Sequence, residues 1–241
     1  MAIKLTSLDQ MPNDIRRALQ RFDSLFGRAE FLDEVLKNPD LYKIATDLDR
    51  LCIEEGVIGF HFTRAFPEDL QAQGLVICSG DERRHKFLAR YGDRFSEAQR
   101  DRIRRAWEDF FDSAQNETRD SRIWFNLTLG ALDNGGADFL LTYFGGEVIN
   151  MPLTDDEEIA AVLRTLGQPL IVESALRTQE LHTFSEIPWG KTWLSGHHVS
   201  INDEASRYDV DAYAIKPISA DHILSVRVAR QDGSPAHWIL E

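Results

Sequence analysis

Residues 57 to 75 constrain the fold of this chain more than any other segment. Val57 to Phe62 is an apolar run that predicts a buried strand, and the polar residues His61, Thr63 and Arg64 stand at its end. A short helix is then expected to open at Pro67 and to end at Gly74. A polar trio between a strand and a helix is predicted to lie at a sheet edge, where ligands commonly bind.

The periodicity of the chain changes at Val57. Residues 12 to 55 carry apolar side chains at helical spacing, whereas strand-like runs follow at 122–129, 170–175, 208–215 and 223–229. Capping boxes at Ser96–Gln99 and Thr154–Glu157 predict two further helices, and residues 137–144 predict a short one. We therefore expect an α+β fold with a mixed or split sheet. Residues 1–56 would form an N-terminal helical cap and 57–241 the core, with a helical insertion at about 76–121.

Composition limits the function classes. A net charge of -13 over 241 residues disfavours non-specific binding to nucleic acid. The four arginines between 100 and 105 stand among acidic residues and predict an ion-paired helix face. No run of 18 apolar residues predicts a membrane span, and the N-terminus does not resemble a secretory signal. With only Cys52 and Cys78, we expect free thiols in the reducing cytoplasm.

His61, Thr63 and Arg64 form the first candidate constellation. Two-residue spacing on a strand places His61 and Thr63 on the same face. A histidine donor beside a threonine hydroxyl suits a ribose or a phosphate, and Arg64 suits a bidentate contact with a pyrophosphate. A structural histidine in the core, next to a helix cap, is the open alternative.

Two further candidates lie later in the chain. Gly145 and Gly146 allow close approach of a ligand to the backbone, with Tyr143 as a stacking ring and Glu147 as a carboxylate. The alternative there is an ordinary helix end with a buried aromatic side chain. Glu173 stands in an apolar run, where a carboxylate must be either paired or protonated. A partner lysine or arginine is the simpler outcome for Glu173.

The last candidates are Asp209 and Asp211, which strand alternation places on one face, with solvated edge residues as the alternative. His197 and His198 are adjacent, and on a strand they would point to opposite faces. No H-E-x-x-H motif or spaced set of cysteines and histidines is present, so no metal site is expected.

The order of these segments resembles the ADP-ribosyltransferase superfamily, which includes RNA 2′-phosphotransferases and DNA-modifying ADP-ribosyltransferase toxins. The resemblance rests on His61-Phe-Thr63, on Leu70-x-x-x-Gly74-Leu75 and on the late segment Asp211 to Ile223 with Pro217. It covers roughly residues 57 to 229, with strands at 122–129 and 170–176 and an aromatic residue at Tyr143 in the expected places.

The resemblance implies NAD as the substrate and no metal. His61 and Thr63 would hold the nicotinamide ribose, Tyr143 would stack on the nicotinamide, and a carboxylate would stabilise the oxocarbenium-like transition state. The late region offers Glu204, Asp209 and Asp211 for that carboxylate. We expect Asp211, with Glu173 as the reserve. A non-catalytic binding or regulatory protein, which contacts a partner protein through its acidic surface, is the alternative function.

Overall fold

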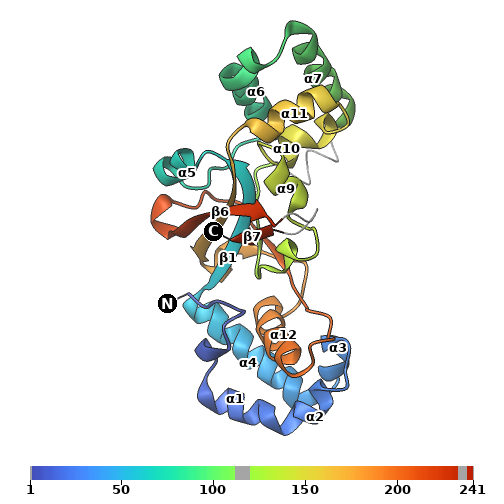
Figure 1. Ribbon diagram of the computed structural model, residues 1–241. Coiled ribbons are helices and arrows are strands. Elements are labelled where there is room, and N and C mark those ends of the chain that lie inside the picture. Colours follow the sequence, from blue (N-terminus) through green and yellow to red (C-terminus); the bar gives the residue numbers. More distant parts are fainter. Residues whose placement is uncertain (1, 112–119, 233–237, 241) are drawn as a thin grey trace. The chain divides into compact units, whose positions relative to one another are not determined.

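The computed structural model describes residues 2–111, 120–232 and 238–240 and shows a mixed α/β protein with a seven-stranded sheet (Figure 1). The chain divides into two compact units. The first comprises Met1–Phe60, Trp124–Gly130 and Ser174–Ala214, and the second comprises His61–Ile123, Ala131–Glu173 and Ile215–Glu241. Each unit is therefore assembled from segments that are distant in the sequence.

The first unit contains a group of helices. They are α1 (Asn13–Leu19), α2 (Asp23–Phe26), α3 (Leu32–Val35), α4 (Pro39–Glu55) and α12 (Pro188–Ile201). In Figure 1, α4 and α12 lie side by side. A Cβ atom on Gly190 of α12 would be 1.9 Å from the carbonyl oxygen of Ala45 in α4, so only glycine permits this close packing.

A buried carboxylate fixes the start of α12. Ile187 precedes the helix with φ 43° and ψ 52° and supplies no side-chain cap. Asp49 of α4 takes this role, because its Oδ1 accepts hydrogen bonds from the amides of Trp189 (3.0 Å) and Gly190 (3.1 Å). Desolvation raises the pKa of Asp49, and these two hydrogen bonds oppose the shift.

Seven strands form the sheet. They are β1 (Val57–Ala65), β2 (Ile123–Asn126), β3 (Gln168–Leu176), β4 (Leu181–His182), β5 (Asp211–Ala214), β6 (Ile223–Gln231) and β7 (Trp238–Leu240). Their order across the sheet is β4-β5-β2-β1-β3-β6-β7. The pairs β1–β2, β4–β5 and β6–β7 are antiparallel.

The helices of the second unit enclose a core of their own. They are α5 (Pro67–Gln73), α6 (Gly80–Tyr91), α7 (Glu97–Phe110), α9 (Asp138–Thr142), α10 (Glu147–Asn150) and α11 (Glu157–Thr165). Figure 1 shows α6, α7, α10 and α11 gathered together. The core between these helices and the residues that connect them consists of the buried side chains Phe87, Phe95, Ile103, Trp107, Ile149, Leu153, Ile159, Leu163 and Leu166.

Short 3-10 helices occur in the chain at Leu8–Gln10, Gln20–Phe22, Gly92–Arg94, Gly130–Leu132, Met151–Leu153, Thr178–Glu180 and Ala220–His222.

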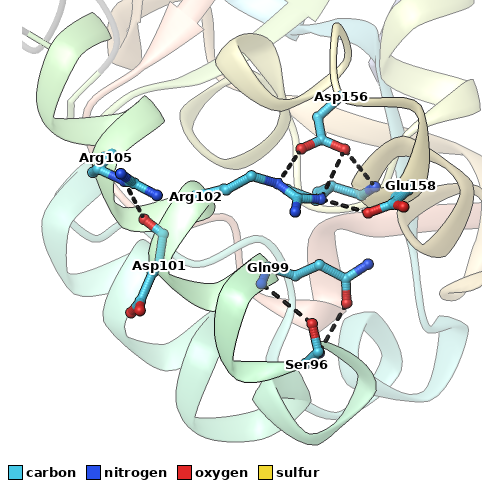
Figure 2. A network of polar contacts seen from close by, with 8 residues as sticks. Ser96, Gln99, Asp101, Arg102, Arg105, Asp156 and Glu158 are labelled. Carbon is cyan, nitrogen blue, oxygen red and sulfur yellow. Dashed lines mark hydrogen bonds and ion pairs between the residues drawn. The ribbon is translucent and has the colours of Figure 1, made fainter.

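Figure 2 shows the polar contacts that cap the start of α7 and join α7 to the start of α11. The predicted capping box is confirmed: Ser96 Oγ accepts from the Gln99 amide, and Gln99 Oε1 accepts from the Ser96 amide. Arg102 pairs with Asp156 at 2.7 Å and with Glu158 at 2.6 Å. The ion-paired character predicted for this arginine-rich helix is therefore confirmed.

Several predicted elements are confirmed, and one is wrong. Strands cover residues 57–62 and 170–175, and α5 has the predicted ends. Thr154 does not cap a helix, since α11 begins at Glu157 and its N-cap Asp156 accepts from the Ile159 amide. His197 and His198 lie in helix α12, which the sequence did not predict. Residues 112–119 of the predicted insertion at about 76–121 fall outside the described residues. No helix in the described part of the chain is long and apolar enough to cross a membrane.

Candidate functional site

The last residues of β1 present His61 and Thr63 on one face of the strand. Phe60 and Phe62 are buried, whereas His61 and Thr63 are half-buried, as strand alternation requires. The strand continues to Ala65, so the polar trio lies inside its final residues and not beyond its end. The predicted common face of His61 and Thr63 is present.

A main-chain hydrogen bond joins this strand to the glycine pair. The amide of Gly145 donates to the carbonyl oxygen of Arg64 at 3.3 Å. Gly145 and Gly146 both have positive φ angles, 95° and 73°, and Gly146 is the N-cap of α10. A Cβ atom on Gly146 would meet no atom within 4 Å, so the space beside its backbone is open. The first two predicted constellations therefore meet within the second unit.

The guanidinium group of Arg64 binds main-chain carbonyls. Its Nε donates to Leu166 O at 2.8 Å, and its two terminal nitrogens donate to Leu141 O and Gly167 O, each at 3.3 Å. Desolvation of this half-buried group lowers the pKa of Arg64. These contacts give Arg64 a structural role, and its predicted contact with a pyrophosphate stays a prediction.

Tyr143 is half-buried between two side chains of its own unit. The ring centroid of Phe139 is 5.4 Å away, and the guanidinium of Arg164 lies 5.4 Å from the Tyr143 centroid. Hydrogen bonds with Glu157 and with Tyr143 raise the pKa of Arg164. The carbonyl of Tyr143 accepts from Asn150 Nδ2 at 3.0 Å, which fixes the start of the glycine loop. Glu147 is exposed at the first position of α10.

Glu173 on β3 has partners on β6. Its Oε2 accepts from Arg227 Nη2 at 3.3 Å and from Ser225 Oγ at 3.4 Å. Arg227 is therefore the positively charged partner that the simpler interpretation of Glu173 predicted.

Asp209 and Asp211 lie on one face with two polar residues near β2. Asn126 Nδ2 donates to Asp211 Oδ1, and Thr128 Oγ1 donates to Asp209 Oδ2. The Thr128 hydroxyl also accepts from the Gly130 amide at 3.0 Å. Desolvation raises the pKa of both carboxyl groups, and the hydrogen bonds from Thr128 and Asn126 oppose the shift. We call Asn126, Thr128, Asp209 and Asp211 the polar row.

Four rings continue this face, and we call them the aromatic cluster. They are Trp124, His182, Phe184 and Tyr213. Tyr213 lies 4.8 Å from Trp124 and 5.1 Å from its cross-strand neighbour His182, between ring centroids. The sequence does contain the signal, because Trp124 and Asn126 alternate with buried residues in the same way as Asp209, Asp211 and Tyr213, although Thr128 is itself buried. The residues near β2 and those near β5 come together because the two strands are neighbours in the sheet, and this pairing cannot be predicted from the sequence.

The described residues contain no group of three metal-ligating side chains placed to hold an ion. His198 is fully buried, and its Nε2 lies 3.0 Å from the carbonyl oxygen of Ala29.

Cys52 and Cys78 are free thiols, as expected, and burial raises the pKa of Cys52.

An open depression of about 520 Å³ lies along α1. It is lined by Asn13, Arg16, Arg17 and Gln20, which share one helix face.

No family model matches the chain, and neither curated proteins nor solved structures yield a match.

Proposed function

We propose that this chain is an NAD-binding enzyme of the ADP-ribosyltransferase type, acting at the nicotinamide ribose in the cytoplasm. The observation that supports the proposal is the hydrogen bond from the Gly145 amide to Arg64 O, which brings the His61 strand and the Tyr143–Glu147 loop together in one unit. The free thiols agree with a reducing compartment. The α+β core of ADP-ribosyltransferase type is part of the same proposal.

Each residue of the proposed site has its own role in binding NAD. His61 and Thr63 hold the nicotinamide ribose from one strand face, and Tyr143 stacks on the nicotinamide. The open backbone at Gly146 lies against the ligand, and Glu147 accepts from a hydroxyl group. Arg64 joins β1 to helix α9 and to the residues after α11 through Leu141 O, Leu166 O and Gly167 O, and is in this respect a positioning residue.

The chemistry at the ribose is a substitution at C1′. The bond between C1′ and the nicotinamide nitrogen breaks, nicotinamide leaves with the electron pair, and an acceptor nucleophile bonds to C1′ and loses its proton. A carboxylate stabilises the positive charge that develops on the sugar. Of the two candidates for this carboxylate, Glu173 belongs to the same unit as His61 and Tyr143, whereas Asp211, the first choice from the sequence, belongs to the first unit.

Calorimetry with NAD and with ADP-ribose tests the binding step. The wild type should bind, and the double variant His61→Ala/Tyr143→Ala should lose at least about tenfold in affinity, because ribose and nicotinamide contacts are both removed. His85→Ala is the matched control, since His85 is an exposed histidine of the same unit. Equal affinity of the double variant, or no heat with either ligand, would refute the proposal.

Release of nicotinamide from NAD tests the carboxylates separately. Asp211→Ala should slow turnover by about 10²-fold or more if Asp211 stabilises the charged sugar, while binding of NAD is retained. Glu173→Ala is measured beside it, and the exposed Asp203→Ala serves as the control. Unchanged turnover in both test variants would remove both residues from catalysis.

A non-catalytic binding protein is the second candidate. It is favoured by the contacts of Arg64 and Glu173, whose charges are engaged by carbonyls and by Arg227. The acidic surface would then contact a partner protein. NAD binding without release of nicotinamide, or the failure of both assays, would favour this candidate.

A further inference from the structure

The aromatic cluster contains an exposed ring that the proposed chemistry does not use. Phe184 is 81% exposed, the highest value among the large apolar side chains with substantial exposure. Its ring centroid lies 6.4 Å from Trp124 and 6.0 Å from Tyr213, so one side of the ring rests on aromatic neighbours and the rest faces water. Large aromatic side chains of this kind are enriched at protein interfaces.

The segment that carries Phe184 is fixed at both ends. His182 pairs with Tyr213 across β4 and β5. At the other end Ile187 has a left-handed backbone, which is rare for a β-branched residue, and Asp49 caps the helix that follows. The hydroxyl of Thr183 donates to Ser185 O at 3.3 Å within the segment. A ring held on a fixed segment loses little conformational entropy on binding.

The charged residues nearest to Phe184 in the sequence are acidic. Residues 178–187 contain Glu180 and Glu186 and neither lysine nor arginine. Asp211, two positions before Tyr213 on β5, is exposed on the same face as the rings. This charge, together with the net charge of -13, disfavours a second copy of the chain or a nucleic acid as the occupant and favours a cation.

Arginine can make both kinds of contact that this surface offers, one with aromatic rings and one with carboxylates. Its planar guanidinium stacks on aromatic rings and pairs with carboxylates at the same time. Three arginines of the second unit lie over aromatic rings: Arg84 over Phe111 (4.3 Å), Arg90 over Phe66 (5.7 Å) and Tyr91 (5.3 Å), and Arg164 over Tyr143 (5.4 Å).

We propose that the aromatic cluster, with Phe184 as its anchor, is a docking surface for an arginine-bearing segment of a partner protein. The arginine stacks on the exposed Phe184 ring, and its charge is balanced by Glu186 and Asp211. Phe184 and Glu186 have no part in the proposed NAD chemistry, so the interaction would persist in a chain that has no enzymatic activity.

Fluorescence anisotropy with synthetic peptides tests this surface on the full chain. The probe is a labelled ten-residue peptide in which arginine alternates with serine, and the matched peptide carries glutamate in place of arginine. The arginine peptide should bind wild type, and Phe184→Ala should weaken it by about tenfold or more. Phe31→Ala is the control, because Phe31 is another exposed phenylalanine of the same unit, 49% exposed.

Glu186→Gln provides a second, isosteric test. It should weaken the arginine peptide about threefold at low salt and reduce the salt dependence of binding. Equal affinity of wild type and Phe184→Ala, equal binding of the glutamate peptide, or no binding would overturn the proposal. Sedimentation velocity completes the test, since a self-association that Phe184→Ala abolishes would assign the surface to a second copy and also overturn it.

Discussion

Arg64 of the second unit and the polar row of the first unit differ in how their polar side chains are used. The guanidinium of Arg64 is directed inward to three carbonyl oxygens. In the polar row, Asp211 is hydrogen-bonded to Asn126 and still exposed, and the aromatic cluster beside it includes the exposed ring of Phe184. Polar side chains therefore stabilise the fold in the first case and form a partly exposed face in the second.

This difference follows from the geometry of each strand. Arg64 lies near the end of β1, where carbonyls from helix α9 and from the turn between α11 and β3 accept from its guanidinium, and unmet carbonyls would cost free energy. On β2 and β5 the polar series faces away from buried Phe125 and Ala212, so its hydrogen bonds run between neighbouring strands.

Replacing Arg64 should have the largest effect on stability. Arg64→Ala leaves three carbonyls without this donor, so we expect the free energy of unfolding to fall by about 3 kcal/mol. Urea denaturation measures it, with the exposed Arg94→Ala as control. A loss no greater than that of the control would show that the inward role of Arg64 is wrong.

Alanine substitutions at Gly145 and Gly146 distinguish the effect of a steric clash on stability from the effect of backbone strain. A Cβ atom at Gly145 would lie 2.8 Å from Ile149 Cγ1, whereas at Gly146 the space is open. We therefore expect Gly145→Ala to cost about 2–3 kcal/mol and Gly146→Ala about 1–2 kcal/mol, the latter from backbone strain alone. The comparison is made by urea denaturation, and the reverse order would contradict the loop geometry.

Asp209 should make stability depend on pH in a defined direction. Its pKa is raised above the ordinary 3.8 in the folded protein, so the folded state binds more protons than the unfolded state above about pH 3.8. The free energy of unfolding contributed by Asp209 therefore falls as the pH rises through this range. Asp209→Asn keeps one acceptor oxygen for the Val210 amide, and its NH2 group can donate to the Thr128 hydroxyl in place of the second oxygen. This variant should therefore gain stability relative to wild type as the pH rises through the same range.

Denaturation between pH 3 and 7 measures this difference, with the exposed Asp203→Asn as the control. Parallel pH profiles for wild type and Asp209→Asn would mean that the carboxyl group is not desolvated.

Phe184→Ala should have the smallest effect on stability. Because Phe184 is 81% exposed, its removal should change the free energy of unfolding by less than about 0.5 kcal/mol. Thermal or urea denaturation checks this value beside the peptide measurements. A loss of more than about 1 kcal/mol would show that the ring contributes to the core of the first unit and is not displayed for binding.

Periodicity predicted the elements whose pattern is local. The alternation of apolar residues located β1 and β3, and turn and capping residues located α5 and α7. Helix α12 was missed because glycines, tryptophans and a histidine pair obscure its helical pattern, and its N-cap comes from Asp49, far away in the sequence. A pattern of neighbouring residues cannot predict a capping partner that is distant in the sequence.

The candidate site shows the same limit. The common face of His61 and Thr63 follows from two-residue spacing, and the sequence order alone suggested that the glycine pair belongs with them. The inward direction of Arg64 and the pairing of Glu173 with Arg227 depend on segments that meet only after folding. The aromatic cluster likewise requires the pairing of β4, β5 and β2.

Hydrogen exchange with and without NAD tests the central claim most directly. If His61 and the glycine loop form one nucleotide site, NAD should slow amide exchange in residues 143–147 and near His61–Ala65, while α12 of the first unit is unchanged. His61→Ala should remove this protection, and His85→Ala should retain it. Protection confined to other segments, or none at saturating NAD, would contradict the account.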